Sequence, residues 1–324
     1  MDSQIRSSFR SQLKAGVASG ALSRSGSASV ATLNSVIASL ISAGEDVAFY
    51  DPSDLTSLYQ SRTGGSNVSA DSDPVGIILD KAQMGGQTAA AFIAGQPELV
   101  TNGANGFNGT AGWSGVSGVT LSEVDGALIL DGGDGSSDRA EYSISGLTVG
   151  RAYRVTITAQ QTVAGSTTSS FGVFTWATVA TQTLSASLTT YKIIAIAMAT
   201  SGVSRIYTAQ GSGDGSEQVK VTNFSVQEIP GYPAIAPSDA ARPLYKASPR
   251  SYIDYDEVDD VHNILLPDGD YDTWTVATDG SVTFDTTTLS GGTGYALSTD
   301  NAGFGITSAT LTASQKTVIE AHYA

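Results

Sequence analysis

Aromatic side chains are the residues of this chain best suited to binding a ligand. Sugar rings stack on aromatic faces, while neighbouring polar groups bind their hydroxyls. The chain has three tryptophans, Trp113, Trp176 and Trp274, and Tyr191 and Tyr207 lie in strand-like runs. We predict glycan contacts at Trp113, Trp176, Tyr191 and Trp274, with Tyr207 as a further candidate. The competing interpretation for each is burial in a β-sandwich core, which is the commoner fate of a single tryptophan.

The run Phe171-Gly-Val-Phe-Thr-Trp176 contains three aromatic residues, each of which could be buried in the core or exposed to a ligand. In a strand, side chains alternate between the two faces of the sheet. Phe174 and Trp176 would then share one face, and Phe171 and Val173 the other. One face must be core, so we expect the other to be exposed or covered by a partner.

Carboxylates in a flexible loop suggest a metal site. Asp131-Gly-Gly-Asp134-Gly-Ser-Ser-Asp138 places three carboxylates in a short glycine-rich segment. Oxygen ligands of this kind suit Ca²⁺, although the spacing does not match an EF-hand. The alternative is a glycine and aspartate turn without metal. A structural calcium ion is the one cofactor that these residues suggest, and no motif requires any other.

Catalysis has little support in the sequence. His262 and His322 are the only histidines, and no HExxH, GxSxG or Walker pattern occurs. We expect His262 in an exposed loop. The acids cluster in turns, whereas burial on apolar strands is what raises the pKa of a catalytic carboxyl. We therefore predict that the protein is not an enzyme, and a polysaccharide depolymerase is the remaining enzymatic alternative.

The composition predicts a mainly β protein of sandwich or jelly-roll domains. Of its 324 residues 40% are hydrophobic and only 15% are charged, and glycines break short Val, Ile, Thr and Tyr runs. A net charge of −15 argues against a nucleic-acid partner. The absence of cysteine excludes disulfides and thiolate metal sites. No apolar run reaches the ~20 residues of a membrane helix, and residues 1–14 lack a signal-peptide core, which predicts synthesis in a cytoplasm without membrane insertion.

Residues 1–46 are predicted to form a short helical arm. Apolar residues recur at helical spacing in two stretches, and Gly44 is placed to end the second helix. The predicted docking residues are Ile5, Phe9, Leu13, Leu33, Ile37 and Leu40. The equally weighted alternative is a helix that packs on the chain's own β domain.

Residues 98–229 read as a run of strands. In 146–159, Tyr153, Val155 and Ile157 alternate with polar residues, and a slip in phase predicts a bulge near Asn223. The opening ELVTNGANGFNGTAGW, the phrase GLTVGRAYRVTITA and the closing VKVTNFSVQEI resemble carbohydrate-binding jelly rolls of the galactose-binding-like type. Jelly rolls of this type often hold a structural Ca²⁺, which the resemblance implies for the loop at 131–138.

Two phrases flank this segment and resemble the halves of one signature. The first contains Phe49-Tyr50-Asp51-Pro52-Ser53-Asp54-Leu55, Pro74-Val75-Gly76 and Asp80-Lys81; the second contains Arg242-Pro243, Tyr252-Ile253-Asp254-Tyr255 and Val258-Asp259-Asp260. Both resemble phrases in concanavalin-A-like sandwiches of phage virion proteins, although Glu257 stands where that pattern has glycine. The resemblance implies a discontinuous lectin-like module, 47–97 plus 238–324, with a jelly roll at 98–229 inserted.

From this resemblance we expect a structural component of a phage-like particle, such as a phage or a gene transfer agent. A head or tail spike would dock on other virion proteins through its arm and form a symmetric homo-oligomer at the virion surface. Its β modules would bind host surface polysaccharide or carry a receptor-binding fibre. The alternative is a secreted carbohydrate-binding or adhesin module.

Overall fold

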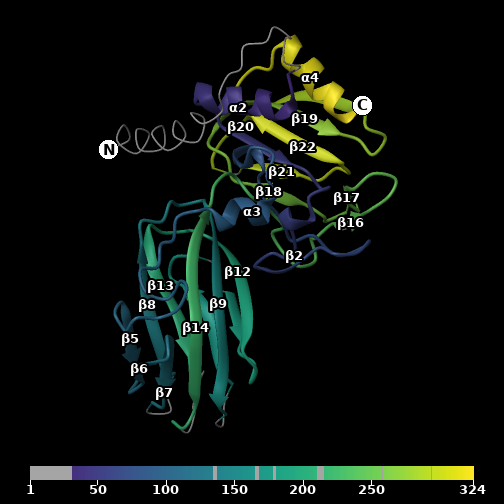
Figure 1. Cartoon of the computed structure of the whole chain (residues 1–324). Helices are drawn as coiled ribbons and strands as arrows, with labels where there is room; N and C mark the ends of the chain where they lie inside the picture. Colours follow the sequence, from purple (N-terminus) through teal and green to yellow (C-terminus); the bar gives the residue numbers. More distant parts are fainter. Residues whose placement is uncertain are drawn as a thin grey trace, which may run out of the picture. The chain divides into compact units, whose positions relative to one another are not determined.

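The computed structural model describes residues 31–324, apart from 134–136, 165–167, 178–179, 210–214, 257 and 293. Within these residues the protein is mainly β, as predicted, and its strands form antiparallel sheets (Figure 1). The described helices are α2 (Leu33–Ala43), α3 (Ala89–Ala94) and α4 (Ala313–Tyr323), with short 3₁₀ turns η1 (Leu55–Ser57) and η2 (Ala82–Met84). None of these helices is long and apolar enough to cross a membrane.

The jelly roll consists of two five-stranded sheets. Sheet I runs in the order β11 (Ala180–Thr183), β10 (Ser170–Phe174), β13 (Ser201–Tyr207), β8 (Arg139–Ser145), β5 (Trp113–Val116). Sheet II runs in the order β12 (Thr189–Ile196), β9 (Ala152–Val163), β14 (Gln218–Ile229), β7 (Ala127–Asp131), β6 (Thr120–Val124). The predicted bulge is confirmed, because the register of β14 against β9 shifts between Val221 and Asn223.

The core of the jelly roll follows from strand alternation. Tyr153, Val155 and Ile157 of β9 are fully buried between the sheets, and their neighbours Arg154 and Thr156 lie on the outer face. Along the strands, apolar side chains at alternate positions point between the two sheets, so these side chains form one continuous hydrophobic core.

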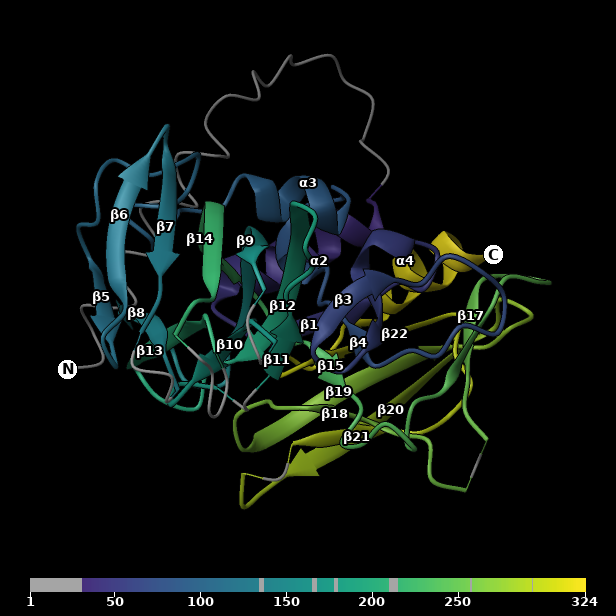
Figure 2. The same cartoon turned by 90° about the horizontal axis from the view of Figure 1, so that it is seen from below.

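A second sandwich is built from strands on both sides of the jelly roll in the sequence. Sheet III has the order β1 (Val47–Tyr50), β22 (Gly303–Thr307), β19 (Gly269–Val276), β20 (Val282–Leu289). Sheet IV has the order β21 (Tyr295–Leu297), β18 (His262–Ile264), β15 (Ala234–Ile235), β4 (Ile77–Ile78), β2 (Leu58–Ser61), β3 (Gly64–Asn67). Figure 2 shows β1 beside β22, although these strands come from opposite ends of the described chain. A hairpin of β16 (Leu244–Lys246) and β17 (Tyr252–Asp254) completes the strands.

The two signature phrases meet in this second sandwich. The amide of Val75 donates to the carbonyl of Pro243 at 2.8 Å, and the amide of Ser72 donates to the carbonyl of Tyr245 at 2.7 Å. The amide of Tyr245 returns a bond to the carbonyl of Asp73 at 2.9 Å. Residues on opposite sides of the jelly roll in the sequence therefore form one backbone network.

Helix α2 packs on its own β domain. Thr32 caps its start, and Gly44 ends it in the left-handed region with φ 89°. Leu33, Ile37 and Leu40 are only 2–4% exposed, because they pack in a cluster with residues of sheet III and α4. Figure 1 shows α2 lying near α4. The docking prediction for these three side chains is therefore wrong, since a buried side chain cannot contact a partner. The other predicted docking residues, Ile5, Phe9 and Leu13, lie outside the described residues.

Candidate functional site

The outer face of sheet I carries a compact group of aromatic and charged side chains. Arg139 and Glu141 stand out from β8 because the alternate residues of that strand point into the core. Arg205 pairs with Glu141 and Tyr207 with Arg139 in the register of β13 on β8. Phe174 lies on the same face at the end of β10. We call these five residues the aromatic–arginine face.

Glu141 holds both arginines of this face. Its Oε1 lies 2.8 Å from Nε of Arg139 and 2.8 Å from Nε of Arg205. The guanidinium of Arg205 lies 4.9 Å from the centre of the Phe174 ring, and that of Arg139 lies 5.9 Å from the Tyr207 ring. The two rings meet edge to face at 5.8 Å. Cation–π and ionic contacts thus fix the geometry of the whole group.

The charge on this face is set by the arginines. Burial would raise the pKa of Glu141, but hydrogen bonds and charge from Arg139 and Arg205 hold that pKa below its usual value. Glu141 is therefore ionised at neutral pH. Two guanidinium groups against one carboxylate leave the face locally positive, on a chain whose net charge is −15.

Phe174 and Trp176 do not share a face, and a single backbone angle explains why. Strand β10 ends at Phe174, and Thr175 takes a φ of +64°. This left-handed residue breaks the alternation and returns Trp176 to the core, where it is fully buried and meets Tyr153 edge to face at 5.9 Å. Phe174 remains partly exposed. The predicted glycan contact at Trp176 is wrong, and the accessible ring of this run is Phe174.

The predicted glycan contacts Trp113, Trp274 and Tyr191 also lie away from this face, whereas the further candidate Tyr207 belongs to it. Trp113 is 7% exposed and donates from Nε1 to the carbonyl of Asn102 at 3.2 Å. Trp274 is fully buried and stacks on Phe49 at 6.5 Å in the other sandwich. Neither ring can stack on a sugar. Tyr191 belongs to sheet II, where it is partly buried and packs on the jelly-roll core.

The predicted calcium ligands do not converge as a set. Asp131 is exposed at the end of β7 and accepts a bond from Nε2 of Gln218 at 3.3 Å. Asp138 is fully buried, because it is in phase with the inward residues of β8. Asp134 lies outside the described residues. Alternation thus sends Asp131 and Asp138 to different sides of their strands. Calcium binding by this loop stays a prediction.

His262 is a core residue, so the prediction of an exposed loop is wrong. It is fully buried in β18, where Nε2 faces the carbonyl of Val75 at 3.0 Å and Nδ1 faces the hydroxyl of Tyr255 at 2.8 Å. Because a carbonyl only accepts, Nε2 carries the proton and Nδ1 accepts from the tyrosine. Burial lowers the pKa of His262 to about 3. A ring that stays neutral and inaccessible near pH 7 is unsuited to acid–base catalysis.

Asp80 has the strongly raised carboxyl pKa expected of a catalytic acid, but its surroundings are structural. Burial raises its pKa to about 6, against the effect of amides that donate to it. Those amides belong to Phe49, Ala82 and Tyr232, at 2.8–2.9 Å. At 1% exposure the carboxyl ties three segments together and cannot reach a substrate.

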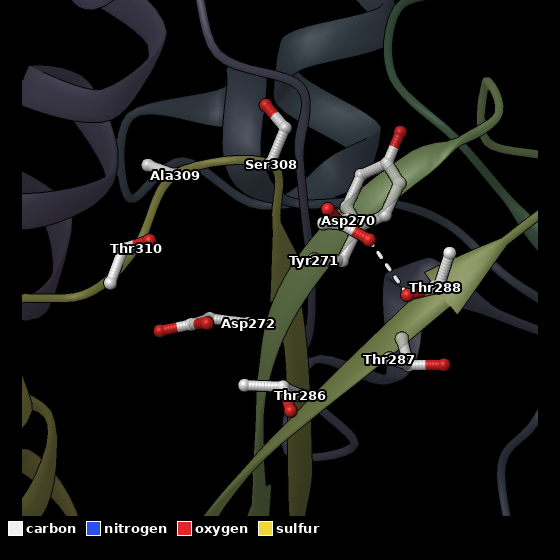
Figure 3. A pocket seen from close by; sticks show the side chains of 9 residues that line it. All are labelled: Asp270, Tyr271, Asp272, Thr286, Thr287, Thr288, Ser308, Ala309 and Thr310. Carbon is white, nitrogen blue, oxygen red and sulfur yellow. Dashed lines mark hydrogen bonds between the residues drawn. The ribbon is translucent and has the colours of Figure 1, made fainter.

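A polar cavity of about 290 Å³ opens at sheet III (Figure 3). It is lined by Asp270, Tyr271, Asp272, Thr286, Thr287, Thr288, Ser308, Ala309 and Thr310. Asp270 accepts from the hydroxyl of Thr288 at 2.7 Å, and Asp272 accepts from the amide of Leu311 at 2.8 Å. Tyr271 is 2% exposed, so the cavity offers hydrogen bonds but no aromatic surface for stacking.

Three acids at the end of the second phrase, Asp256, Asp259 and Asp260, form a turn. Carboxylate oxygens of Asp256, Asp259 and Asp260 lie within 4.8 Å of one another. Asp256 accepts from the amides of Val258, Asp259 and Asp260, at 2.9–3.3 Å. Backbone capping therefore accounts for the position of Asp256.

No protein-family model and no curated protein matches the chain. Among solved structures, a mutant of a family 29 carbohydrate-binding module is similar at 17% identity, over 42% of this chain and 92% of that one, with a TM-score of 0.30. A cellulose-binding domain of a Cellulomonas fimi β-1,4-glucanase has 16% identity, coverage of 42% and 97%, and a TM-score of 0.32. A xylan-binding domain from Paenibacillus barcinonensis has 14% identity, coverage of 41% and 96%, and a TM-score of 0.31. Similarities of this size do not assign the chain to a family or give it a ligand.

Proposed function

We propose that this chain is a non-catalytic polysaccharide-binding protein whose binding surface is the aromatic–arginine face. One observation carries the proposal. Phe174 presents a partly exposed ring beside the guanidinium of Arg205, which lies 4.9 Å from the ring centre and is held by Glu141 at 2.8 Å. An aromatic ring with fixed polar neighbours is the arrangement that sugar recognition requires.

The chemistry of each group defines the ligand. A pyranose would place its C–H face on the exposed part of the Phe174 ring. Glu141 holds Arg205 at its Nε, and the Nη atoms of the guanidinium supply further donors for sugar hydroxyls or carboxylates. The local excess of positive charge favours acidic polysaccharides over neutral ones. Because the side chains are already held in place, binding immobilises few rotamers.

Glycan binding is tested by substitution of the ring. Phe174→Ala removes the stacking surface, and we expect affinity for a bound acidic polysaccharide to fall by about tenfold, or ~1.4 kcal/mol. Val124→Ala is the matched control, since Val124 is 51% exposed on sheet II. Affinity electrophoresis through polysaccharide gels measures both, and an assay for reducing ends tests for cleavage. Equal mobility shifts for the two variants would contradict the site, and release of reducing ends would contradict a non-catalytic role.

A second candidate function is structural, as a surface component of a phage-like particle. It is favoured by the meeting of the two signature phrases at Val75 and Pro243, which fits one module interrupted by an insertion. In this proposal the jelly roll is displayed for host polysaccharide, and the chain is a symmetric homo-oligomer bound to other virion proteins. Co-sedimentation with intact particles tests it. A secreted adhesin would bind the same glycan but would never sediment with particles.

A further inference from the structure

The jelly roll begins with the only three Asn-Gly pairs of the chain, Asn102-Gly103, Asn105-Gly106 and Asn108-Gly109. Asparagine is a thermolabile residue, and before glycine it is prone to spontaneous deamidation. In this reaction the backbone nitrogen of the glycine attacks the side-chain carbonyl carbon of the asparagine. Glycine permits the attack because it has no Cβ to restrict the backbone. The three pairs share one reactive sequence, so differences between them come from the fold.

Asn102 is held in place by three hydrogen bonds of its side chain. Its Oδ1 accepts from the amide of Asn108 at 2.9 Å, and its Nδ2 donates to the carbonyls of Gly109 at 3.2 Å and Ala111 at 3.0 Å. The side-chain carbonyl cannot turn toward the nitrogen of Gly103 unless these bonds break. The fold therefore protects Asn102.

Asn105 is exposed, but the amide that would attack it is already bonded. The amide of Gly106 donates to the carbonyl of Gly103 at 3.3 Å, in a bridge between these two residues. The carbonyl of Gly103 is itself fixed, because it also accepts from the amide of Phe224 at 3.0 Å. Attack by the Gly106 nitrogen would break this bridge, so Asn105 is protected through its neighbour.

Asn108 has neither protection. Its side chain is exposed and makes no hydrogen bond within the described part of the chain, and the amide of Gly109 has no acceptor there either. Gly109 also has open space around it, since a Cβ at this position would meet no atom within 4 Å. Both reacting groups are therefore free to approach each other.

We propose that Asn108 is a site of spontaneous deamidation, while Asn102 and Asn105 are stable in the folded chain. The nitrogen of Gly109 forms a bond to Cγ of Asn108, and the side-chain nitrogen leaves as ammonia with the proton that the Gly109 nitrogen gives up. Water then opens the resulting succinimide ring at either carbonyl, which yields aspartate or isoaspartate. Water is the only co-reactant, and the product carries an added negative charge.

Deamidation at this position reaches the core of the jelly roll through Asn102. Isoaspartate adds a methylene to the backbone of residue 108, whose amide holds Oδ1 of Asn102. The carbonyl of Asn102 in turn accepts from Nε1 of the buried Trp113 at 3.2 Å. We therefore expect the deamidated chain to melt at a lower temperature than the fresh chain.

Peptide mapping of the full-length chain tests the site. The chain is kept in warm, mildly alkaline buffer with and without urea, and deamidation is followed by mass spectrometry after cleavage by chymotrypsin, which separates Asn108 from the other two asparagines at Phe107. In the folded chain we expect Asn108 to deamidate about fivefold faster than Asn105 and about a hundredfold faster than Asn102, since one and three hydrogen bonds must break first. In urea the three rates should converge. If Asn102 or Asn105 reacts as fast as Asn108 in the folded chain, or if none of the three reacts there, the proposal is overturned.

Asn108→Gln and Asn105→Gln form a matched pair of variants, each compared with its own fresh protein. Glutamine keeps the amide but reacts far more slowly, because its attack would close a larger ring. Asn108→Gln should keep its Tm during the incubation, and the Tm of Asn105→Gln should fall at the wild-type rate. Equal rates of fall in both variants would refute the role of Asn108. A wild-type Tm that stays constant while Asn108 deamidates would refute its effect on the core.

Discussion

The buried His262 makes the stability of this protein depend on pH in a defined window. In the folded chain its pKa is lowered from 6.5 to about 3, because burial disfavours the charged ring. Between these values the unfolded chain binds a proton that the folded chain does not. The contribution of the neutral, buried His262 to the free energy of unfolding is therefore fully present above pH 6.5. It is lost as the pH falls toward 3.

The size of the effect follows from the two pKa values. Each pH unit within the window costs about 1.36 kcal/mol, so acidification from pH 6.5 to pH 5 removes about 2 kcal/mol. Over the whole window the loss reaches about 5 kcal/mol. For a domain whose net stability is about 5–15 kcal/mol, this one residue accounts for much of its acid sensitivity.

The contribution of His262 to this pH dependence is measured by urea unfolding of the wild type and of His262→Gln, each at pH 7 and pH 5. The substitution lowers the free energy of unfolding at both pH values, because the bonds to Val75 and Tyr255 are altered. This loss cancels when the value for each protein at pH 5 is subtracted from its own value at pH 7. Other titrating groups, such as Asp80 with its raised pKa, cancel in the same way because both proteins have them. We expect the free energy of unfolding of the wild type to fall by about 2 kcal/mol more than that of the variant. Equal losses in the two proteins would show that burial of His262 does not cause the acid sensitivity.

Three further predictions follow from the packing. Gly305→Ala places a Cβ 1.9 Å from Cζ2 of the buried Trp274, so chemical denaturation should show that the free energy of unfolding falls by about 3 kcal/mol. Gly95→Ala is the control, because its Cβ would have its nearest contact at 3.5 Å, and its effect should be near neutral. Deletion of residues 1–44 removes the buried Leu33, Ile37 and Leu40 and should lower the Tm sharply compared with a deletion that stops at Ala31; equal melting temperatures would contradict the packing of α2. Glu141→Gln should reduce polysaccharide affinity severalfold, because a neutral amide holds the two arginines less firmly in position than the carboxylate does. Circular dichroism should show an unchanged fold, since ion pairs of this partly exposed kind contribute only ~1 kcal/mol.

Local patterns in the sequence predicted local structure well. The alternation of Tyr153, Val155 and Ile157 identified the inward face of β9, and Gly44 marked the end of α2. The slip in phase near Asn223 identified the bulge in β14. Each of these features depends on residues a few positions apart, so the sequence contains the relevant information.

The site depended on contacts that local patterns do not contain. Alternation placed Phe174 and Trp176 together, and only the left-handed φ of Thr175 separates them. The pairing of Arg205 with Glu141 requires the register of β13 on β8, which comes from the fold as a whole. Tryptophan size also misled the prediction, because the largest rings fill the two cores and the smaller Phe174 remains accessible.

The role of the aromatic–arginine face is tested most directly by the polysaccharide affinity of Phe174→Ala measured beside that of Val124→Ala. Both remove apolar side-chain atoms from the jelly-roll surface, on different sheets. We expect an acidic polysaccharide that retards the wild type in affinity electrophoresis to retard Val124→Ala equally and Phe174→Ala about tenfold more weakly. Retention of full affinity by a folded Phe174→Ala would contradict the assignment of the aromatic–arginine face as the binding surface.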